Sequence, residues 1–138
     1  SLDLITAIHV IEHIDDKELR KVFMKFNFFL KNNGYILLST PAKNGFAHKL
    51  KNEQWIGYKD DTHINLKSFN AWKNFFILNN LHIVLSSNDG LWNFPYKIKK
   101  NTFKILKIFF IMIFQVYTGK LFLDSEDGET CIFLLQKI

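Results

Sequence analysis

The densest group of chemically competent side chains lies near the start of the chain, where two histidines flank a glutamate. His9, Glu12 and His13 have the spacing H-x-x-E-H. On a helix this spacing is typical of zinc peptidases, in which both imidazoles bind the ion and the carboxylate acts as a base. On a strand the two histidines would lie roughly 13 Å apart, at about 3.3 Å per residue, and could not share one ion. The chemistry of this motif therefore depends on the element that carries it.

The segment 2–14 fits either a helix or a strand by its own pattern. Its isoleucines recur every three positions, as on a helix, but its β-branched residues are as dense as in a buried strand. Asp15 and Glu18 have the spacing of a helix N-cap and its capping box, and a helix continuous from Leu2 would have no use for a cap there. We therefore predict a strand, a short loop and a helix, and we expect neither a peptidase nor a metal site.

The rest of the chain alternates between helical and extended patterns. From Lys17 the apolar residues form one helical stripe, and Gly34 suits a left-handed position at its end. A polar segment at 42–67 is predicted to be an irregular loop, long enough to be functional. The other predicted elements are strands at 35–39, 81–86 and 131–136, with Pro41 stopping the first of these, and a helix at 68–79 capped by Ser68.

Composition narrows the class of protein. The chain has 138 residues, of which 48% are hydrophobic and 22% charged, which is typical of one packed domain rather than a disordered tail. A lone Cys131 excludes an internal disulfide and favours a cytoplasmic setting. The net charge of +5 comes almost entirely from lysine, with Arg20 as the single arginine. Because readers of base sequence rely on arginine, we expect no nucleic-acid partner.

One apolar stretch raises the question of membrane contact. Residues 108–114 are wholly apolar, but Lys104 and Lys107 precede them and Gln115 follows, so the stretch is far shorter than the ~20 residues of a spanning helix. We predict a buried helix here. The alternative is an amphipathic helix that lies on a membrane surface. The protein would then be a non-catalytic or membrane-surface binding module that binds through the basic apolar segment 97–114.

The order of motifs along the chain resembles class I S-adenosylmethionine-dependent methyltransferases. Residues 3–14 (D-L-I-T-A-I-H-V-I-E-H-I) are similar to the family's fourth strand, and residues 30–41 (L-K-N-N-G-Y-I-L-L-S-T-P) to its fifth. Later landmarks are similar too: D-D-T-H at 60–63, D-G-L-W-N-F-P at 89–95 and G-K-L-F-L at 119–123. The family's glycine-rich cofactor loop would precede Ser1, and no G-x-G occurs here.

The resemblance implies an α/β fold, the C-terminal half of a Rossmann-like methyltransferase domain. Its sheet would be mostly parallel, with an antiparallel last strand inserted between its two predecessors. As a partial domain, the chain is expected to be inactive alone. The implied parts of this single domain are strand-helix-strand at 1–41, an acceptor-side loop at 42–67, helix-strand at 68–86, an apolar helical insertion at 87–123 and the last strand at 124–138.

The resemblance also implies S-adenosylmethionine as cofactor and a small-molecule or glycan- or lipid-like acceptor, with peripheral membrane contact as a further expectation. His13 and His63 are the candidate catalytic residues, because an imidazole suits proton removal near neutral pH. The residues expected at the cofactor are Ala7, Ile8, Val10, Glu12 and His13. Those expected at the acceptor are Asp61, Thr62 and Trp92.

Each candidate also has a purely structural interpretation. His13 could cap the following helix, Glu12 could accept hydrogen bonds from backbone amides, and Trp92 could belong to the core. His63 could equally be a base, part of an acceptor-binding cluster or a staple of its loop. His9 stands where the family has glutamate, which puts a family role for His9 in doubt.

Overall fold

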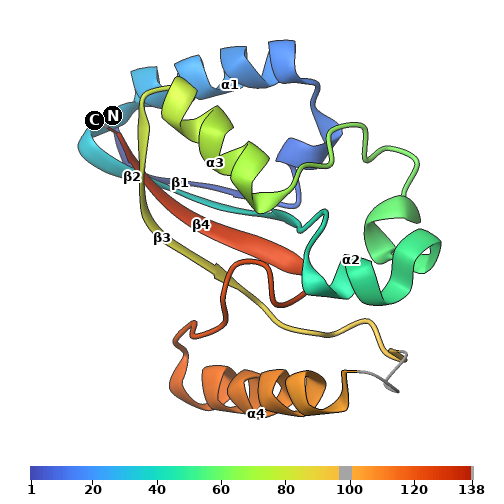
Figure 1. Cartoon of the computed structure of the whole chain (residues 1–138). Coiled ribbons are helices and arrows are strands. Elements are labelled where there is room, and N and C mark those ends of the chain that lie inside the picture. Colours follow the sequence, from blue (N-terminus) through green and yellow to red (C-terminus); the bar gives the residue numbers. More distant parts are fainter. Residues whose placement is uncertain (97–100, 138) are drawn as a thin grey trace.

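The structure is a computed structural model that describes residues 1–96 and 101–137 (Figure 1). Its strands are β1 (Leu2–Ile8), β2 (Leu30–Pro41), β3 (Leu81–Asn88) and β4 (Thr130–Lys137). Its α-helices are α1 (Asp16–Phe29), α2 (Phe46–Lys51), α3 (Phe69–Leu78) and α4 (Thr102–Thr118). Three short 3-10 turns complete the elements: η1 (Ile11–His13), η2 (Asn52–Gln54) and η3 (Ile56–Tyr58).

The four strands form one sheet in the order β1-β2-β4-β3. β1 and β2 are parallel, and β4 runs antiparallel to both β2 and β3. Three strands therefore point in the same direction, with the last strand reversed and inserted between its two predecessors. This arrangement confirms the predicted α/β class and the predicted place of the last strand.

The two faces of the sheet have different surroundings. α1 and α3 lie on the same side (Figure 1), and the row Ala7, Leu38 and Phe133, which crosses three strands, is buried beneath them in the main core. On the next row, facing the other way, Leu37 and Leu134 are only half-buried. One face is thus packed, while the other is partly open. Among the described strands, β1 pairs only with β2, so its other edge is free.

The start of α1 forms as its sequence predicts. The Asp15 carboxylate accepts hydrogen bonds from the backbone N–H groups of Lys17 at 2.9 Å and Glu18 at 3.0 Å. The Glu18 carboxylate binds the Lys21 ammonium at 2.6 Å. The cap ends the loop after η1 and confirms the predicted order of strand, loop and helix. Ser68 caps α3 in the same way, by accepting from the backbone N–H of Ala71 at 3.3 Å.

The predicted left-handed cap at Gly34 is wrong. α1 ends at Phe29, and the residue with a left-handed backbone is Asn33, within β2, with φ of 62°. Gly34 lies within β2, where a Cβ atom would stand 3.0 Å from both the Leu30 side chain and the Lys31 carbonyl oxygen. Glycine is needed there for close packing of the backbone rather than for a left-handed conformation.

Two further predictions need correction. Segment 42–67 is not an irregular loop throughout, because it contains α2 and the turns η2 and η3. α4 is not a buried helix: one side is buried, but most of its remaining apolar residues are exposed. The reason is that α4 packs against a second, smaller core and not between two layers. Within the described residues, no helix is long and apolar enough to cross a membrane.

The cap gives a test of the local structure. Replacing the exposed cap in Asp15→Ala leaves two N–H groups of α1 without their acceptor, and we expect a loss of about 1 kcal/mol in the free energy of unfolding. Urea unfolding followed by circular dichroism measures this loss. Asp15→Ser retains an acceptor oxygen and is expected to recover most of it; an equal loss in both variants would contradict the capping role.

Candidate functional site

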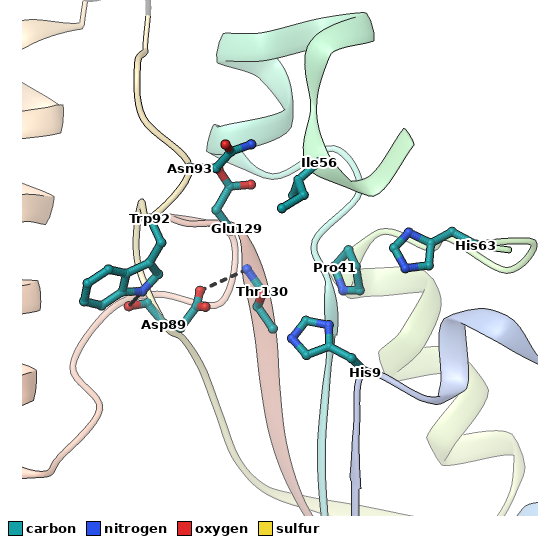
Figure 2. Close-up of a pocket in the computed structure, with 9 residues that line it drawn as sticks. All are labelled: His9, Pro41, Ile56, His63, Asp89, Trp92, Asn93, Glu129 and Thr130. Atoms are coloured by element: carbon teal, nitrogen blue, oxygen red, sulfur yellow. Dashed lines mark hydrogen bonds between the residues drawn. The ribbon is translucent and has the colours of Figure 1, made fainter. Parts of the chain in front are cut away.

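A cavity of about 400 Å³ opens where the strands of common direction end. His9 follows β1, Pro41 ends β2, Asp89 follows β3, and Thr130 begins the reversed strand β4. In open α/β sheets this carboxyl edge is where ligands bind. The full lining, drawn in Figure 2, is His9, Pro41, Ile56, His63, Asp89, Trp92, Asn93, Glu129 and Thr130.

The two predicted catalytic histidines lie side by side although they are far apart in sequence. The ring centroids of His13 and His63 are 4.7 Å apart. His63 lines the cavity, and its side chain is only 11% exposed. His13 is not one of the lining residues. The structure therefore brings the pair together and gives His63 the access to the cavity.

Hydrogen bonds fix the proton position on His13. The Thr62 hydroxyl donates to the Asp60 carboxylate at 2.5 Å and lies 2.8 Å from Nδ1 of His13. The hydroxyl has a single hydrogen, which it donates to Asp60, so toward His13 it can only accept. Nδ1 of His13 therefore carries the hydrogen, and Nε2 of the neutral ring is the basic atom. The hydrogen bonds from the Thr62 side chain and backbone also lower the pKa of Asp60.

His63 is oriented by a backbone carbonyl. Its Nδ1 lies 2.9 Å from the Gly57 carbonyl oxygen, which can only accept, so the hydrogen again sits on Nδ1. Its Nε2 lies 3.7 Å from an Asp60 carboxylate oxygen. A proton taken up at Nε2 is therefore stabilised by a nearby negative charge.

The H-x-x-E-H motif does not form a zinc peptidase site. His9 follows β1 with φ of 51°, and Glu12 and His13 lie on η1, so the two histidines do not occupy adjacent turns of one helix. Nδ1 of His9 instead contacts the fully buried Glu12 carboxylate at 3.1 Å. This hydrogen bond raises the pKa of His9.

One other grouping could hold a cation. Glu12, His13 and His63 each bring a ligand atom within 4.8 Å of the others. Oε2 of Glu12 has no hydrogen-bond partner in the described part of the chain. A carboxylate and two imidazoles are suitable ligands for a divalent ion or for a shared proton. The prediction that the site contains no metal stays a prediction.

Asp89 and Trp92 form the wall of the cavity opposite the histidines (Figure 2). The Asp89 carboxylate accepts a hydrogen bond from the backbone N–H of Thr130 at 3.0 Å. The backbone carbonyl of Asp89 accepts a hydrogen bond from the Trp92 indole N–H at 3.0 Å. Trp92 is 57% exposed, so it lines the cavity instead of belonging to the core. Burial raises the pKa of Asp89 to about 6.

Glu129 is a lining residue that the sequence did not indicate. The Trp55 indole donates to its Oε2 at 3.0 Å, and the Tyr96 hydroxyl donates to its Oε1. Burial raises the pKa values of both Glu129 and Tyr96. Lys51 lies over the Tyr96 ring, 4.8 Å from its centroid. Because these partners are distant in sequence, no local pattern around Glu129 marks it.

The residues predicted to contact the cofactor do not form one surface. The Ala7 side chain lies in the main core, and Glu12 is fully buried. Ile8 and Val10, 52% and 43% exposed, present apolar surface at the open end of β1. Of the residues predicted to contact the acceptor, Asp61 is exposed and does not line the cavity. Thr62 does not line the cavity either, and its hydroxyl is hydrogen-bonded to His13.

The raised pKa of Asp89 predicts a change of stability with pH. Its protonated form is favoured in the folded state, so the stability it contributes is complete below its ordinary pKa of 3.8 and is lost as the pH rises through about 6. Asp89→Asn cannot ionise but keeps an oxygen for the Thr130 N–H. Between about pH 4 and pH 7 the free energy of unfolding of the unmodified protein should fall by about 2 to 3 kcal/mol relative to the variant. Urea unfolding across this range measures the difference, and identical pH profiles would contradict burial of the carboxyl.

Comparisons with known proteins agree with the architecture. The sequence matches a family described as a methyltransferase domain over residues 1–86. An S-adenosylmethionine-dependent methyltransferase from Archaeoglobus fulgidus superposes with a TM-score of 0.54 at 15% identity, covering 99% of this chain and 59% of that one. A proposed S-adenosylmethionine-dependent methyltransferase from Listeria monocytogenes gives 0.50 at 10% identity, covering 100% and 62%.

These likenesses differ in what they establish. The structural matches have low identity and show the fold, and this chain spans only 59% and 62% of their lengths. No curated protein matches the sequence. The family match extends over more than half of the chain. On that match, with the sheet order and the cavity at its carboxyl edge, the chain belongs to the methyltransferase domain family.

Proposed function

We propose that this chain is the downstream half of an S-adenosylmethionine-dependent methyltransferase and forms the acceptor side of its active site. The observation that carries the proposal is the cavity at the carboxyl edge of a methyltransferase-type sheet, with an oriented imidazole, His63, in its wall. The remaining length of the solved methyltransferases would supply the other side of the site.

The cofactor, when bound, supplies a methyl group on a sulfonium, which an acceptor atom displaces in line. The protein's task is then to position the acceptor and remove its proton. The exposed apolar side chains of Ile8 and Val10 would contact the methionine part of the cofactor. Ala7 would contribute through its backbone, because its side chain faces the core.

His63 is the base in this proposal. Its Nδ1 hydrogen is held by Gly57, so Nε2 is left to take a proton from an acceptor hydroxyl or ammonium group. Asp60 stabilises the resulting imidazolium from 3.7 Å. His13, fixed by Thr62, borders His63 and keeps it in place, so we assign His13 a positioning role and, through its free Nε2, a route for the proton.

The cavity wall supports an acceptor with hydroxyl groups and an apolar face. Asp89, Asn93 and Glu129 offer hydrogen-bonding groups, while Trp92 and Ile56 offer apolar surface. Flat aromatic surfaces beside hydrogen-bond acceptors suit sugars and other small polyols. These features favour a small-molecule or glycan-like acceptor, with Asp61 outside the cavity as a further contact for a larger one.

The cofactor assignment is tested by calorimetric titration with S-adenosylhomocysteine. We expect a longer protein, which includes the residues encoded upstream of Ser1, to bind S-adenosylhomocysteine. In that protein Val10→Trp should weaken binding about tenfold or more, because the indole would fill the space of the methionine part of the ligand. Leu78→Trp, at a position on α3 that is 78% exposed, is the matched control and should bind normally. Absence of binding by the unmodified protein would refute the cofactor assignment.

The role of His63 is tested in the same longer protein, by measuring the transfer of a labelled methyl group from S-adenosylmethionine to a panel of free monosaccharides. With an accepted sugar, His63→Ala should lower kcat by about 100-fold or more, because the step loses its base, while affinity for S-adenosylhomocysteine stays unchanged. Thr62→Val should lower kcat less, since it removes the hydroxyl that accepts from His13 but keeps the backbone carbonyl of residue 62, which lies 3.2 Å from His13 Nδ1. Unchanged kcat in His63→Ala would exclude it as the base.

A further inference from the structure

α4 is firmly attached to the rest of the molecule along one side. Ile105, Ile108 and Met112 are buried in the smaller core. The Gln115 side-chain oxygen accepts from the backbone N–H groups of Phe122 at 2.7 Å and Leu123 at 2.9 Å. These contacts fix the rotation of the helix about its axis, and therefore fix which residues face outward.

The outward side of α4 is apolar over the length of the helix. We call the residues Phe103, Leu106, Phe110, Ile113 and Tyr117 the outer stripe; they are spaced by three and four positions and are 91%, 50%, 67%, 53% and 87% exposed. Phe109, Phe114 and Val116 widen this surface on its two sides and are also exposed. So broad an apolar surface costs free energy in water and indicates an apolar partner.

α4 and its immediate flanks in sequence carry lysine as their only charged residue type, whereas Asp124 and Asp127 lie in a groove that Lys104 and Lys107 also line. Between Gly90 and Leu123 the sequence has no aspartate or glutamate and has lysines at 97, 99, 100, 104, 107 and 120. Lys104 is paired with Asp127 at 2.5 Å. Lys107 and Lys120 are exposed at the margins of the apolar surface. Apolar surface with lysine at its border complements the interface of an anionic bilayer, where ammonium groups meet lipid headgroups.

Other occupants fit this surface less well. A second copy paired through α4 would bring like charges together without acidic partners on the helix, and the apolar surface is wider than a coiled-coil seam. The upstream part of a methyltransferase sheet would pair at the free edge of β1, whereas α4 is the next element of the chain after β3, which forms the opposite edge of the sheet.

We propose that α4 is a membrane-surface helix, whose outer stripe inserts among the acyl chains of an anionic bilayer while Lys107 and Lys120 contact lipid phosphates. The inference does not depend on the proposed methyl transfer. α4 also contacts the cavity wall, because the Leu91 N–H donates to the Met112 sulfur at 3.1 Å beside Trp92. Binding through α4 would therefore hold the cavity close to the bilayer.

The test is co-sedimentation of the protein with vesicles made of equal parts phosphatidylcholine and phosphatidylserine. We expect binding that weakens as salt is raised. Phe110→Ser together with Tyr117→Ser should weaken partitioning by about tenfold or more, because two aromatic side chains that would insert among the acyl chains are lost. Lys107→Ala should weaken it about fivefold, and only on anionic vesicles.

A matched control lies on α1, where Phe28 is 81% exposed; Phe28→Ser should leave partitioning unchanged. Among the described residues, neither core cluster includes an outer-stripe residue, so their replacement should not unfold the protein, and circular dichroism verifies this. Absence of vesicle binding, equal loss in the Phe28 variant, or a dimer in sedimentation that Phe110→Ser abolishes would overturn the proposal.

Discussion

The insertion of β4 between β2 and β3 is the constraint on which the candidate site depends. Because β4 runs opposite to its neighbours, its first residues lie where the other strands end. That reversal carries Glu129 and Thr130 to the carboxyl edge of the sheet, next to Pro41 and Asp89. A last strand added in the common direction would have placed these residues at the far end. The reversed pairing therefore closes the cavity on one side.

The cavity joins two walls of different chemistry. On one wall, the Gly57 carbonyl fixes the proton of His63 on Nδ1, so Nε2 is its basic nitrogen. The neighbouring His13, which is not a lining residue, has its proton fixed by the Thr62 hydroxyl. On the other, Asp89 and Glu129 are carboxyls whose pKa values burial raises. The proposed methyl transfer uses this division: an imidazole takes the proton, while the opposite wall holds the acceptor.

The surfaces left uncovered are as informative as those that are packed. The half-open face of the sheet and the free edge of β1 are available to further layers of a methyltransferase fold. The outer stripe of α4 faces away from the small core that holds the helix. The apolar residues of the outer stripe and the lysines beside it suit a lipid surface. We therefore assign the outer stripe to a bilayer, and the open sheet face and the free edge of β1 to the rest of the methyltransferase fold.

Local sequence patterns predict the elements that depend on near neighbours. The Asp15 cap, the periodicity of α1 and the extended run before Pro41 act over a few residues, so the strand, loop and helix could be predicted. The resemblance to methyltransferases added the place of the last strand. It also selected His13 and His63, which the fold indeed brings together.

Contacts between groups that are far apart in the sequence depend on the folded structure. Glu129 acquires its partners from Trp55 and Tyr96, and no local pattern encodes such contacts. The sequence predicts a left-handed position at Gly34, but crowding against Leu30 explains the glycine instead. The apolar run in α4 fits a buried helix equally well by composition. Its exposure follows from packing against one layer alone, because burial depends on what the fold places on each side of a helix.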